Sequence, residues 1–594
     1  MKKFLLSCAL GVVSANLAAQ SMALNYSYDY EAKTATVIQD KRWHENDDGT
    51  GGFWYNMYEG DIIIPSQTPD GYTVVAIGDQ AFARLTTNEN ERSITSVVIP
   101  NTVKTIGDQA FYSCYRLSSV TIPASVESIG EMVFNSSGIK TLTIEDGDTP
   151  ITIGGSGSVV GSVLNSAQNC TSVYVGRNIN YANDSQTTFG FSGFLTDLTY
   201  GPKVTRIMAK ECWRSPSIQR ITFLGEELEE IPEDAFAECT ALISITLPDK
   251  VSVIGKSAFK ECKVLQDISL PAHVTTISDE AFRGCHALAS LSIPATVTTV
   301  GFGALMSSGI KMLRFEDGDA TLTLGEDIFS YNSGMTVYDG RPLETTASNN
   351  RLFEFNSAII DFTYGPLTRS IHPSEWHSSQ LQRLTINSDY ITVIPKEAFF
   401  DCRSLQAATL HTQLLTIDES AFNDCSSLAS VSIPQGCQLQ TIGDWAFCNA
   451  PLTSFPMPDG VTSIGRGAFL RCQLTSIKIP AGVTTIDGRA FEGNSTMKTI
   501  YAFPVKPVSI EADVFNNVDK NTCKLYVPQG SYEAYKAAPV WKDFFLTEEG
   551  LETGIADILC KQPGVWYSVE GRRLSTKPDK PGLYIFGGKK YGVK

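Results

Sequence analysis

The sequence is poor in three features that would each indicate a particular class of protein. After its first residues, no stretch approaches the ~18 apolar residues of a membrane-spanning helix. Only 6 histidines occur among 594 residues, and they match neither a catalytic triad nor the His-Glu-x-x-His spacing of a zinc site. The net charge of −17 argues against binding nucleic acid or anionic lipid by charge alone. We therefore expect no transmembrane segment, metal, cofactor or catalytic residue, and no enzyme.

The first residues have the pattern of an export signal. A basic start, Met1-Lys2-Lys3, is followed by an apolar stretch from Phe4 to Val13 and by small residues at Ser21-Met22-Ala23. This order is typical of a cleaved signal peptide rather than a membrane span. We predict a signal peptide over residues 1–23, with cleavage after Ala19 as an alternative, and hence a secreted or cell-surface protein.

One unit recurs along most of the chain and is clearest from Leu242 to Cys285. There the pattern Leu-x-x-Ile-x-Leu-Pro-x-x-Val-x-x-Ile-Gly-x-x-Ala-Phe-x-x-Cys is written nearly twice. A period in this range is the signature of stacked repeats. Alternating apolar residues predict a short strand, proline ends it, and Ala-Phe-x-x-Cys predicts a short helical turn. We expect a single elongated, mainly β repeat solenoid over residues 73–527, with parallel strands on one face.

The 14 cysteines would suggest disulfides in an exported protein, but their positions argue against bridges. Stacked coils would place equivalent side chains ~4.8 Å apart and parallel, which does not suit disulfide geometry. We therefore predict buried free thiols. Seven cysteines follow a repeat phenylalanine by three residues: Cys114, Cys239, Cys262, Cys285, Cys402, Cys425 and Cys472.

A longer period is superimposed on the short one. Glu145-Asp-Gly-Asp148 returns as Glu316-Asp-Gly-Asp319, and Thr199-Tyr-Gly-Pro202 returns as Thr363-Tyr-Gly-Pro366. A block of several coils therefore looks duplicated. Each copy has a poorly patterned middle, at about residues 154–193 and 326–356, which we interpret as irregular coils with long loops.

Both ends of the chain depart from the repeat. Residues 24–72 have the alternation of strands and predict an N-terminal hairpin cap, because a solenoid must cover its first open core face. Residues 528–550 include Trp541 and Phe544 and predict an aromatic C-terminal cap. In the last part, residues 561–594 carry eight Lys/Arg against two Asp/Glu. We predict a small β tail over residues 551–594, which is also a candidate sorting segment.

The unit written at Leu117–Ile129 and Leu242–Cys285 resembles the BspA-type leucine-rich repeat of bacterial surface proteins. The segments around Asp61-Ile-Ile-Ile-Pro65 and Leu525-Tyr-Val-Pro528 resemble the usual flanks of that family. The resemblance covers about residues 25–546. The tail is similar to C-terminal segments of exported proteins from Bacteroidetes-type bacteria, some of which are sorting signals. Membership would imply a secreted or surface-attached binding protein without catalysis, often an adhesin.

The two Glu-Asp-Gly-Asp clusters have two interpretations. Calcium is bound by carboxylate and carbonyl oxygens, and these clusters are rich in carboxylates. They lack the alternating ligand spacing of a calcium loop, however, and Asp-Gly is common in tight turns. We favour turns and leave calcium binding open.

The outward positions of the predicted strands form our candidate binding surface. Small hydroxyl residues suit a crowded parallel ladder, and they would also leave a flat polar face for docking. Larger aromatic residues in the irregular coils are either interface anchors or fillers of gaps left by missing phenylalanines; we favour the second. The candidates are Ser119, Thr121, Ser244, Thr246, Ser290, Ser292, Tyr200, Trp213, Tyr364 and Trp376.

These observations lead to two functional hypotheses. The first is an exported cell-surface leucine-rich-repeat protein that binds a host or neighbouring-cell protein as a non-enzymatic module or adhesin. The alternative is a surface glycan-binding protein that uses the aromatic residues of the irregular coils.

Overall fold

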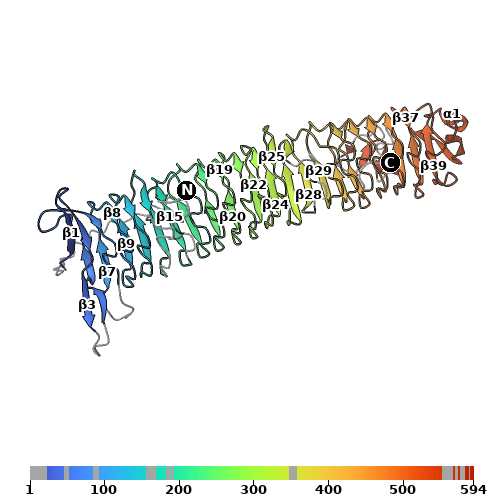
Figure 1. Ribbon diagram of the computed structural model, residues 1–594. Coiled ribbons are helices and arrows are strands. Elements are labelled where there is room, and N and C mark those ends of the chain that lie inside the picture. Colours follow the sequence, from blue (N-terminus) through green and yellow to red (C-terminus); the bar gives the residue numbers. More distant parts are fainter. Residues whose placement is uncertain are drawn as a thin grey trace. The chain divides into compact units, whose positions relative to one another are not determined.

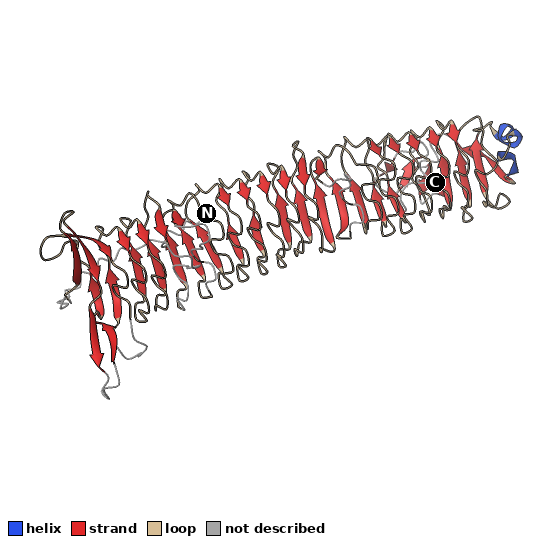
Figure 2. Ribbon diagram, in the orientation of Figure 1, coloured by secondary structure: helices blue, strands red, loops and turns tan. Residues whose placement is uncertain are grey.

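The computed structural model describes residues 23–45, 52–84, 93–154, 169–181, 189, 193–346, 353, 357–551, 566–568, 573–574, 582–586 and 589–593. The predicted signal peptide therefore lies almost wholly outside the described residues. The chain forms two compact units, Met1–Glu227 and Leu228–Lys594. Nearly all regular structure in both units is β-strand, and the helical residues belong to the C-terminal part of the second unit (Figure 2).

A typical coil has three sides: a longer strand, a shorter strand and a hydrogen-bonded turn. Within each unit the longer strands of successive coils lie side by side (Figure 1). In the first unit they are β5 (Gly60–Ile63), β7 (Ile94–Val98), β9 (Ser119–Ile122), β11 (Thr141–Ile144), β13 (Ser172–Val175), β15 (Asp197–Tyr200) and β16 (Arg220–Phe223). The shorter strands there are β6 (Thr73–Ile77), β8 (Thr105–Ile106), β10 (Ser128–Ile129), β12 (Ile151–Ile153) and β14 (Ile179–Tyr181).

The second unit repeats this arrangement with more coils. Its longer strands are β18 (Ser244–Thr246), β20 (Asp267–Ser269), β22 (Ser290–Ile293), β24 (Met312–Phe315), β26 (Met335–Asp339), β28 (Ile359–Tyr364), β29 (Arg383–Ile386), β31 (Ala407–Thr409), β33 (Ser430–Ser432), β36 (Ser476–Ile479), β38 (Thr499–Ala502) and β39 (Lys524–Pro528). Its shorter strands are β17 (Glu230–Ile231), β19 (Val253–Ile254), β21 (Thr276–Ile277), β23 (Thr299–Val300), β25 (Leu322–Leu324), β27 (Leu343–Thr345), β30 (Val393–Ile394), β32 (Thr416–Ile417), β34 (Thr441–Ile442), β35 (Ser463–Ile464) and β37 (Thr485–Ile486).

Parallel pairing in register turns the sequence repeat into columns of like side chains. Leu142 of β11 pairs with Val173 of β13, which pairs with Leu198 of β15, and all three side chains are buried. Because side chains alternate across a strand, the intervening Ser and Thr residues form outward columns. The predicted parallel β-solenoid is confirmed, but the coils carry a second parallel ladder, of shorter strands, beside the predicted one.

The turns differ from the short helical turns that the sequence predicted. In the turn around Phe111, Gln109 and Ser113 have φ of 55° and 56°. Left-handed residues at these positions interrupt a right-handed helix. The turn has internal bonds, such as that from the Cys114 N–H to the Phe111 carbonyl at 3.3 Å, and it is also bonded to the next coil: the Phe111 N–H donates to the Val133 carbonyl at 3.0 Å.

The repeat phenylalanines form stacked columns in the interior. Phe259 and Phe282 are fully buried, with ring centroids 5.5 Å apart and planes within 3° of parallel. Phe422 and Phe447 repeat this geometry at 5.2 Å and 4°. Each ring removes roughly 150–250 Å² from water, so neighbouring coils stabilise one another through this column.

The prediction of buried free thiols is confirmed for the 12 cysteines among the described residues. Most repeat thiols donate to the carbonyl of the core aromatic residue one coil earlier, as Cys285 Sγ does to Phe259 O at 3.1 Å. The Asn494 amide makes the equivalent bond to Phe469 O at 2.8 Å. In most coils this position therefore carries a small buried donor, because a buried carbonyl without a partner is costly. Burial raises the pKa of Cys285 to about 12, which keeps the thiol protonated.

The Ile-Gly step that recurs in many of the units has a steric cause. A Cβ on Gly130 would lie 2.3 Å from an Asp108 carboxylate oxygen and 2.6 Å from the Asp108 nitrogen. That carboxylate must approach closely because it accepts the Glu131 N–H at 2.8 Å. Glycine therefore allows one coil to receive the side chain of the coil before it.

Additional elements lie at the two ends of the chain. They are β1 (Asn25–Asp29), β2 (Thr34–Ile38), β3 (Lys41–Glu45), β4 (Gly52–Asn56), α1 (Tyr532–Ala537), the 3₁₀ helix η1 (Trp541–Asp543), β40 (Leu546–Leu551), β41 (Trp566–Ser568), β42 (Arg573–Leu574), β43 (Gly582–Phe586) and β44 (Lys589–Val593). In the first unit β1 pairs antiparallel with β2, and β3 with β4. In the second unit β41–β44 form an antiparallel sheet in the order β42-β41-β43-β44.

Aromatic side chains cover the last core phenylalanine of the second unit. The rings of Trp541 and Phe544 each lie 5.4 Å from that of Phe515, nearly edge-on. The Trp541 indole N–H donates to Val508 O at 2.8 Å, and the Tyr535 hydroxyl donates to Pro504 O at 2.7 Å. These bonds satisfy the polar atoms of the rings, so the apolar surfaces close the end of the core.

Candidate binding surface

The six hydroxyl residues predicted for the binding surface all point outward from the longer strands. Each is exposed, while the apolar residue between the two members of a pair is buried. They are Ser119 and Thr121 on β9, Ser244 and Thr246 on β18, and Ser290 and Ser292 on β22. These residues therefore belong to an outward face of small polar side chains in each unit.

Three of the four predicted aromatic candidates lie inside the molecule. Tyr200 and Tyr364 are 1% exposed and Trp376 is 0% exposed. Trp376 precedes Phe399 by 23 residues and occupies the phenylalanine position of its coil, where its ring stacks on Phe353 at 4.3 Å. Its indole N–H donates to the Tyr364 hydroxyl at 2.8 Å. These three residues fill the core, so they offer no contact to a partner on the surface.

The fourth aromatic candidate, Trp213, is half-buried at the surface of the first unit. The Arg214 guanidinium lies 4.6 Å from its ring centroid and the Lys210 ammonium lies 5.6 Å from it. Such cation–π contacts hold the ring in place. Cys212, not Trp213, occupies the core position, because the neighbouring left-handed residues are Lys210 and Arg214.

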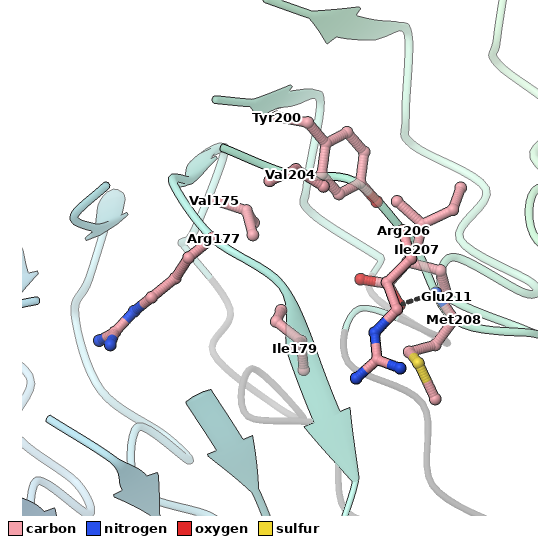
Figure 3. A pocket seen from close by; sticks show the side chains of 9 residues that line it. All are labelled: Val175, Arg177, Ile179, Tyr200, Val204, Arg206, Ile207, Met208 and Glu211. Atoms are coloured by element: carbon pink, nitrogen blue, oxygen red, sulfur yellow. Dashed lines mark hydrogen bonds between the residues drawn. The ribbon is translucent and has the colours of Figure 1, made fainter. Parts of the chain in front are cut away.

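A hollow in the first unit was not expected from the sequence (Figure 3). Its walls include Tyr200, Glu211 and Arg177, yet it leaves no room for a water molecule. Arg177 points away from Glu211 and donates to the carbonyls of Pro123 and Ala124 at 2.9 and 2.8 Å. The Arg177 side chain therefore joins coils and does not form an acid–base pair with Glu211.

The position in the second unit that corresponds to this hollow contains polar residues. We call residues 141–215 the first copy and residues 312–379 the second copy of the duplicated segment. Val175 and Val204 of the first copy correspond to Asp339 and Thr368 of the second. The Thr368 hydroxyl donates to the Asp339 carboxylate at 3.1 Å, and burial raises the pKa of Asp339 to about 7.

A second buried carboxyl group lies in the same copy. Glu375 accepts the His372 N–H at 2.8 Å, and burial raises its pKa to about 8. The Arg341 guanidinium donates to the carbonyls of Ala295 and Val297 at 2.8 and 2.7 Å. Both carboxyl groups are at most 3% exposed, so their raised pKa values reflect burial inside the coil stack and not a reaction site open to substrate.

The carboxylates of the Glu-Asp-Gly-Asp turns are engaged within the protein. In the first copy, Asp146 accepts the Tyr174 hydroxyl at 2.7 Å and Asp148 pairs with Lys203 at 2.8 Å. The hydrogen bond from Lys203 and its charge hold the pKa of Asp148 below its usual value. Among the described residues, no cluster of three or more His, Cys, Asp or Glu is arranged to hold a metal ion.

The sequence reasoning missed three outward residues of the second copy: Met312, Arg314 and Tyr338. Met312 is 63% exposed, and the Arg314 guanidinium lies 4.0 Å from the centroid of the Tyr338 ring. They occupy the two outward columns where most coils carry Ser or Thr. Comparing the two copies position by position would have found Met312 and Arg314, since Thr141 and Thr143 stand there in the first copy.

Comparison with known proteins identifies the family. The model of the BspA-type leucine-rich repeat region matches residues 75–212, 205–336, 347–472 and 437–535, in 6 copies. These matches cover well over half of the chain, and the chain belongs to this family. A search of curated proteins found no match.

Solved structures of bacterial leucine-rich-repeat proteins are similar to the chain at low identity. A leucine-rich repeat protein from Bacteroides ovatus is 17% identical with a TM-score of 0.29, and the match covers 89% of this chain and 99% of that one. A leucine-rich cell surface protein from Faecalibacterium prausnitzii is 20% identical with a TM-score of 0.20, covering 90% and 100%. The pneumococcal vaccine antigen PcpA is 16% identical with a TM-score of 0.24, covering 86% and 99%.

No helix among the described residues combines the length and the apolar composition needed to cross a membrane.

Proposed function

We propose that the chain is an exported cell-surface protein that binds a host or neighbouring-cell protein through the outward face of its longer strands, without catalysis. The main observation in support of this proposal is the contrast between that face and the interior. Outward positions such as Ser244 on β18 and Ser290 on β22 are exposed, whereas the interior is filled by stacked phenylalanines. Solenoids commonly bind partners on such extended surfaces.

Three further observations support this proposal. The family of BspA-type repeats is one of repeat modules suited to protein binding, and the first residues have the pattern of an export signal. In addition, the buried carboxyl groups of Asp339 and Glu375, which have raised pKa values, accept hydrogen bonds within the coil stack. An adhesin role is consistent with all of these features.

The location is tested on intact cells that produce the full chain. External protease should degrade the chain while a cytoplasmic marker stays intact. Protection of the chain in intact cells, with degradation only after lysis, would contradict export to the surface.

The binding face is tested with purified full-length protein against a panel of purified host and bacterial surface proteins. The double variant Ser244→Arg/Ser290→Arg should lower affinity for any partner found at least tenfold, because two bulky charges would interrupt the face. The matched control is Thr299→Arg, an exposed outward position on the shorter-strand ladder, which should bind normally. Normal binding by Ser244→Arg/Ser290→Arg together with weakened binding by Thr299→Arg would instead place the partner on the ladder of shorter strands. Turnover in a broad hydrolase screen would argue against a non-enzymatic role.

Glycan binding remains a second candidate because Trp213 is half-exposed and lies beside two cations. Loss of glycan-array binding in Trp213→Ala would support this function. Glycan binding that Trp213→Ala leaves intact would remove its structural basis.

A further inference from the structure

The two copies of the duplicated segment differ on the outward side of one strand. In the first copy, Thr141 and Thr143 of β11 point outward. In the second copy, Met312 and Arg314 of β24 take these positions, and both strands pair in the same register with the strand that follows. The second copy therefore adds one exposed apolar side chain and one positive charge to a face that is otherwise rich in Ser and Thr.

The Met312 side chain is longer than those of its two neighbours in the outward column. It pairs with Ser290 on one side and Thr336 on the other, and both of these side chains are small. The flexible thioether of methionine adapts to differently shaped apolar partners. Since Met312 is 63% exposed, covering it would remove apolar surface from water.

Arg314 is held in a defined orientation beside Met312. Its guanidinium lies over the Tyr338 ring, 4.0 Å from the centroid, and donates to an Asp317 carboxylate oxygen at 3.0 Å. The Tyr338 hydroxyl donates to the other oxygen of that carboxylate at 2.6 Å. The Arg314 side chain is still 47% exposed. The Arg314 guanidinium has five N–H donors in a planar arrangement that suits a carboxylate. Because the side chain is already held in place, binding a partner would cost less conformational entropy.

We infer that Met312, Arg314 and Tyr338 form a docking point for a segment of a partner protein in which an Asp or Glu stands beside an apolar side chain. The inference rests on the proposed function and names the chemistry of the partner. Lys311 and Arg314 flank Met312 in the sequence and both are exposed. Asp317 accepts from one terminal nitrogen of the Arg314 guanidinium, and the other N–H groups provide donors for a carboxylate of the partner. Tyr, Met and Arg are enriched at the centres of protein interfaces.

The geometry favours a protein segment over a sugar. Stacking of a sugar requires an open aromatic face. The Arg314 guanidinium covers one face of Tyr338, and Gly365 of the next coil also lies close to this ring. An apolar side chain on Met312 with a carboxylate on Arg314 uses both residues at once. The first copy retains the Tyr174–Asp146 contact without the methionine and the arginine, so it provides a natural reference.

The test uses a display library of random 12-residue peptides selected on immobilised full-length protein. Selected peptides should be enriched in Asp or Glu next to Leu, Ile, Phe or Met. The variant Met312→Thr/Arg314→Thr, which copies the first copy's residues, should lower their affinity at least tenfold. The variant Ser430→Thr/Ser432→Thr on β33 changes the same pair of outward positions elsewhere and should bind normally.

Charge reversal sharpens the result. Arg314→Glu should shift selection from acidic peptides to peptides containing Lys or Arg. Peptides without carboxylates, or peptides whose binding ignores both changes at Met312 and Arg314, would overturn the inference. Binding of neutral oligosaccharides that depends on Met312 and Arg314 would also overturn the inference. A protein partner lost with Ser244→Arg/Ser290→Arg but retained with Met312→Thr/Arg314→Thr would overturn this docking point and leave the proposed function standing.

Discussion

The two copies of the duplicated segment keep the same framework but fill its interior differently. Both have the Tyr–Asp contact at the acidic turn, at 2.7 Å in the first copy and 2.6 Å in the second. Both also bury an arginine that donates to carbonyls of an earlier coil. At the core position, however, the first copy has Cys212 and the second has Trp376.

The comparison shows that the changes inside the second copy are coordinated. Trp376 donates to the Tyr364 hydroxyl, whereas in the first copy the thiol of Cys212 lies against the Tyr200 hydroxyl. Similarly, Asp339 and Thr368 hydrogen-bond to each other where the first copy has Val175 and Val204. The apolar pair of the first copy corresponds to a hydrogen-bonded pair in the second. The hydrogen bond offsets the cost of burying the Asp339 carboxyl group.

The largest effect is expected from Trp376→Cys, which gives the second copy the core residue of the first. The change removes the stack on Phe353 at 4.3 Å and the bond to Tyr364. Large-to-small core changes of this kind cost about 3–5 kcal/mol. Urea denaturation with hydrogen-exchange mass spectrometry should show lost protection in β28 and β29.

The matched variant in the first copy is Cys212→Ala, which removes only one buried sulfur and should cost about 1 kcal/mol. Equal losses for the two variants would mean that the tryptophan contributes no more than the cysteine it corresponds to.

The second prediction concerns the pH dependence of the second copy. The pKa values of Asp339 and Glu375 are raised by burial to about 7 and about 8 in the folded state. Between about pH 4 and pH 8 the folded state then binds more protons than the unfolded state, so stability falls as pH rises. At about 1.4 kcal/mol per pKa unit, the loss is on the order of 4 kcal/mol for each group.

Asp339→Val/Thr368→Val gives the second copy the apolar pair of the first and should weaken this dependence. Unfolding midpoints measured from pH 4 to pH 8 give the comparison. An unchanged slope in the double variant would show that Asp339 does not carry the effect.

Much of the fold could be predicted because the repeat is local and periodic. The alternation around Val120 and Ile122 marks the buried face of a strand, and the fixed phase of Phe259 and Phe282 marks the core column. The turn conformation could not be predicted, because its left-handed positions are occupied by ordinary residues such as Gln109 and Ser113. Glycine, which adopts positive φ freely, takes these positions in only a few coils, as at Gly284 and Gly303.

The candidate surface was harder to predict because the irregular coils change length. Counting 23 residues back from Phe399 gives Trp376, which is in the core. The same count from Phe236 gives Trp213, but the structure places Cys212 at the core position. One additional residue in that coil is enough to move a tryptophan from the core to the surface.

A smaller effect is expected at the acidic turns. Tyr338→Phe and Tyr174→Phe each remove one hydrogen bond to a partly exposed carboxylate, at a cost of about 1 kcal/mol. The consequence should differ between copies, because Asp317 also holds Arg314. Hydrogen exchange of residues 312–319 should increase in Tyr338→Phe more than exchange of residues 141–148 does in Tyr174→Phe. Equal increases would indicate that Arg314 gains no order from Tyr338.

The smallest effect is expected at the ion pairs that link the outward face of each copy to the strand that follows it. Arg220 lies 2.6 Å from Asp197, and Arg383 lies 2.8 Å from Asp361. Exposed pairs contribute about 0.2–1 kcal/mol and are screened by salt. Arg220→Ala and Arg383→Ala should therefore lower stability slightly and equally in denaturation at low salt, with the difference vanishing at about 1 M salt. An unequal loss that survives high salt would show that the copies differ on this face as well as inside.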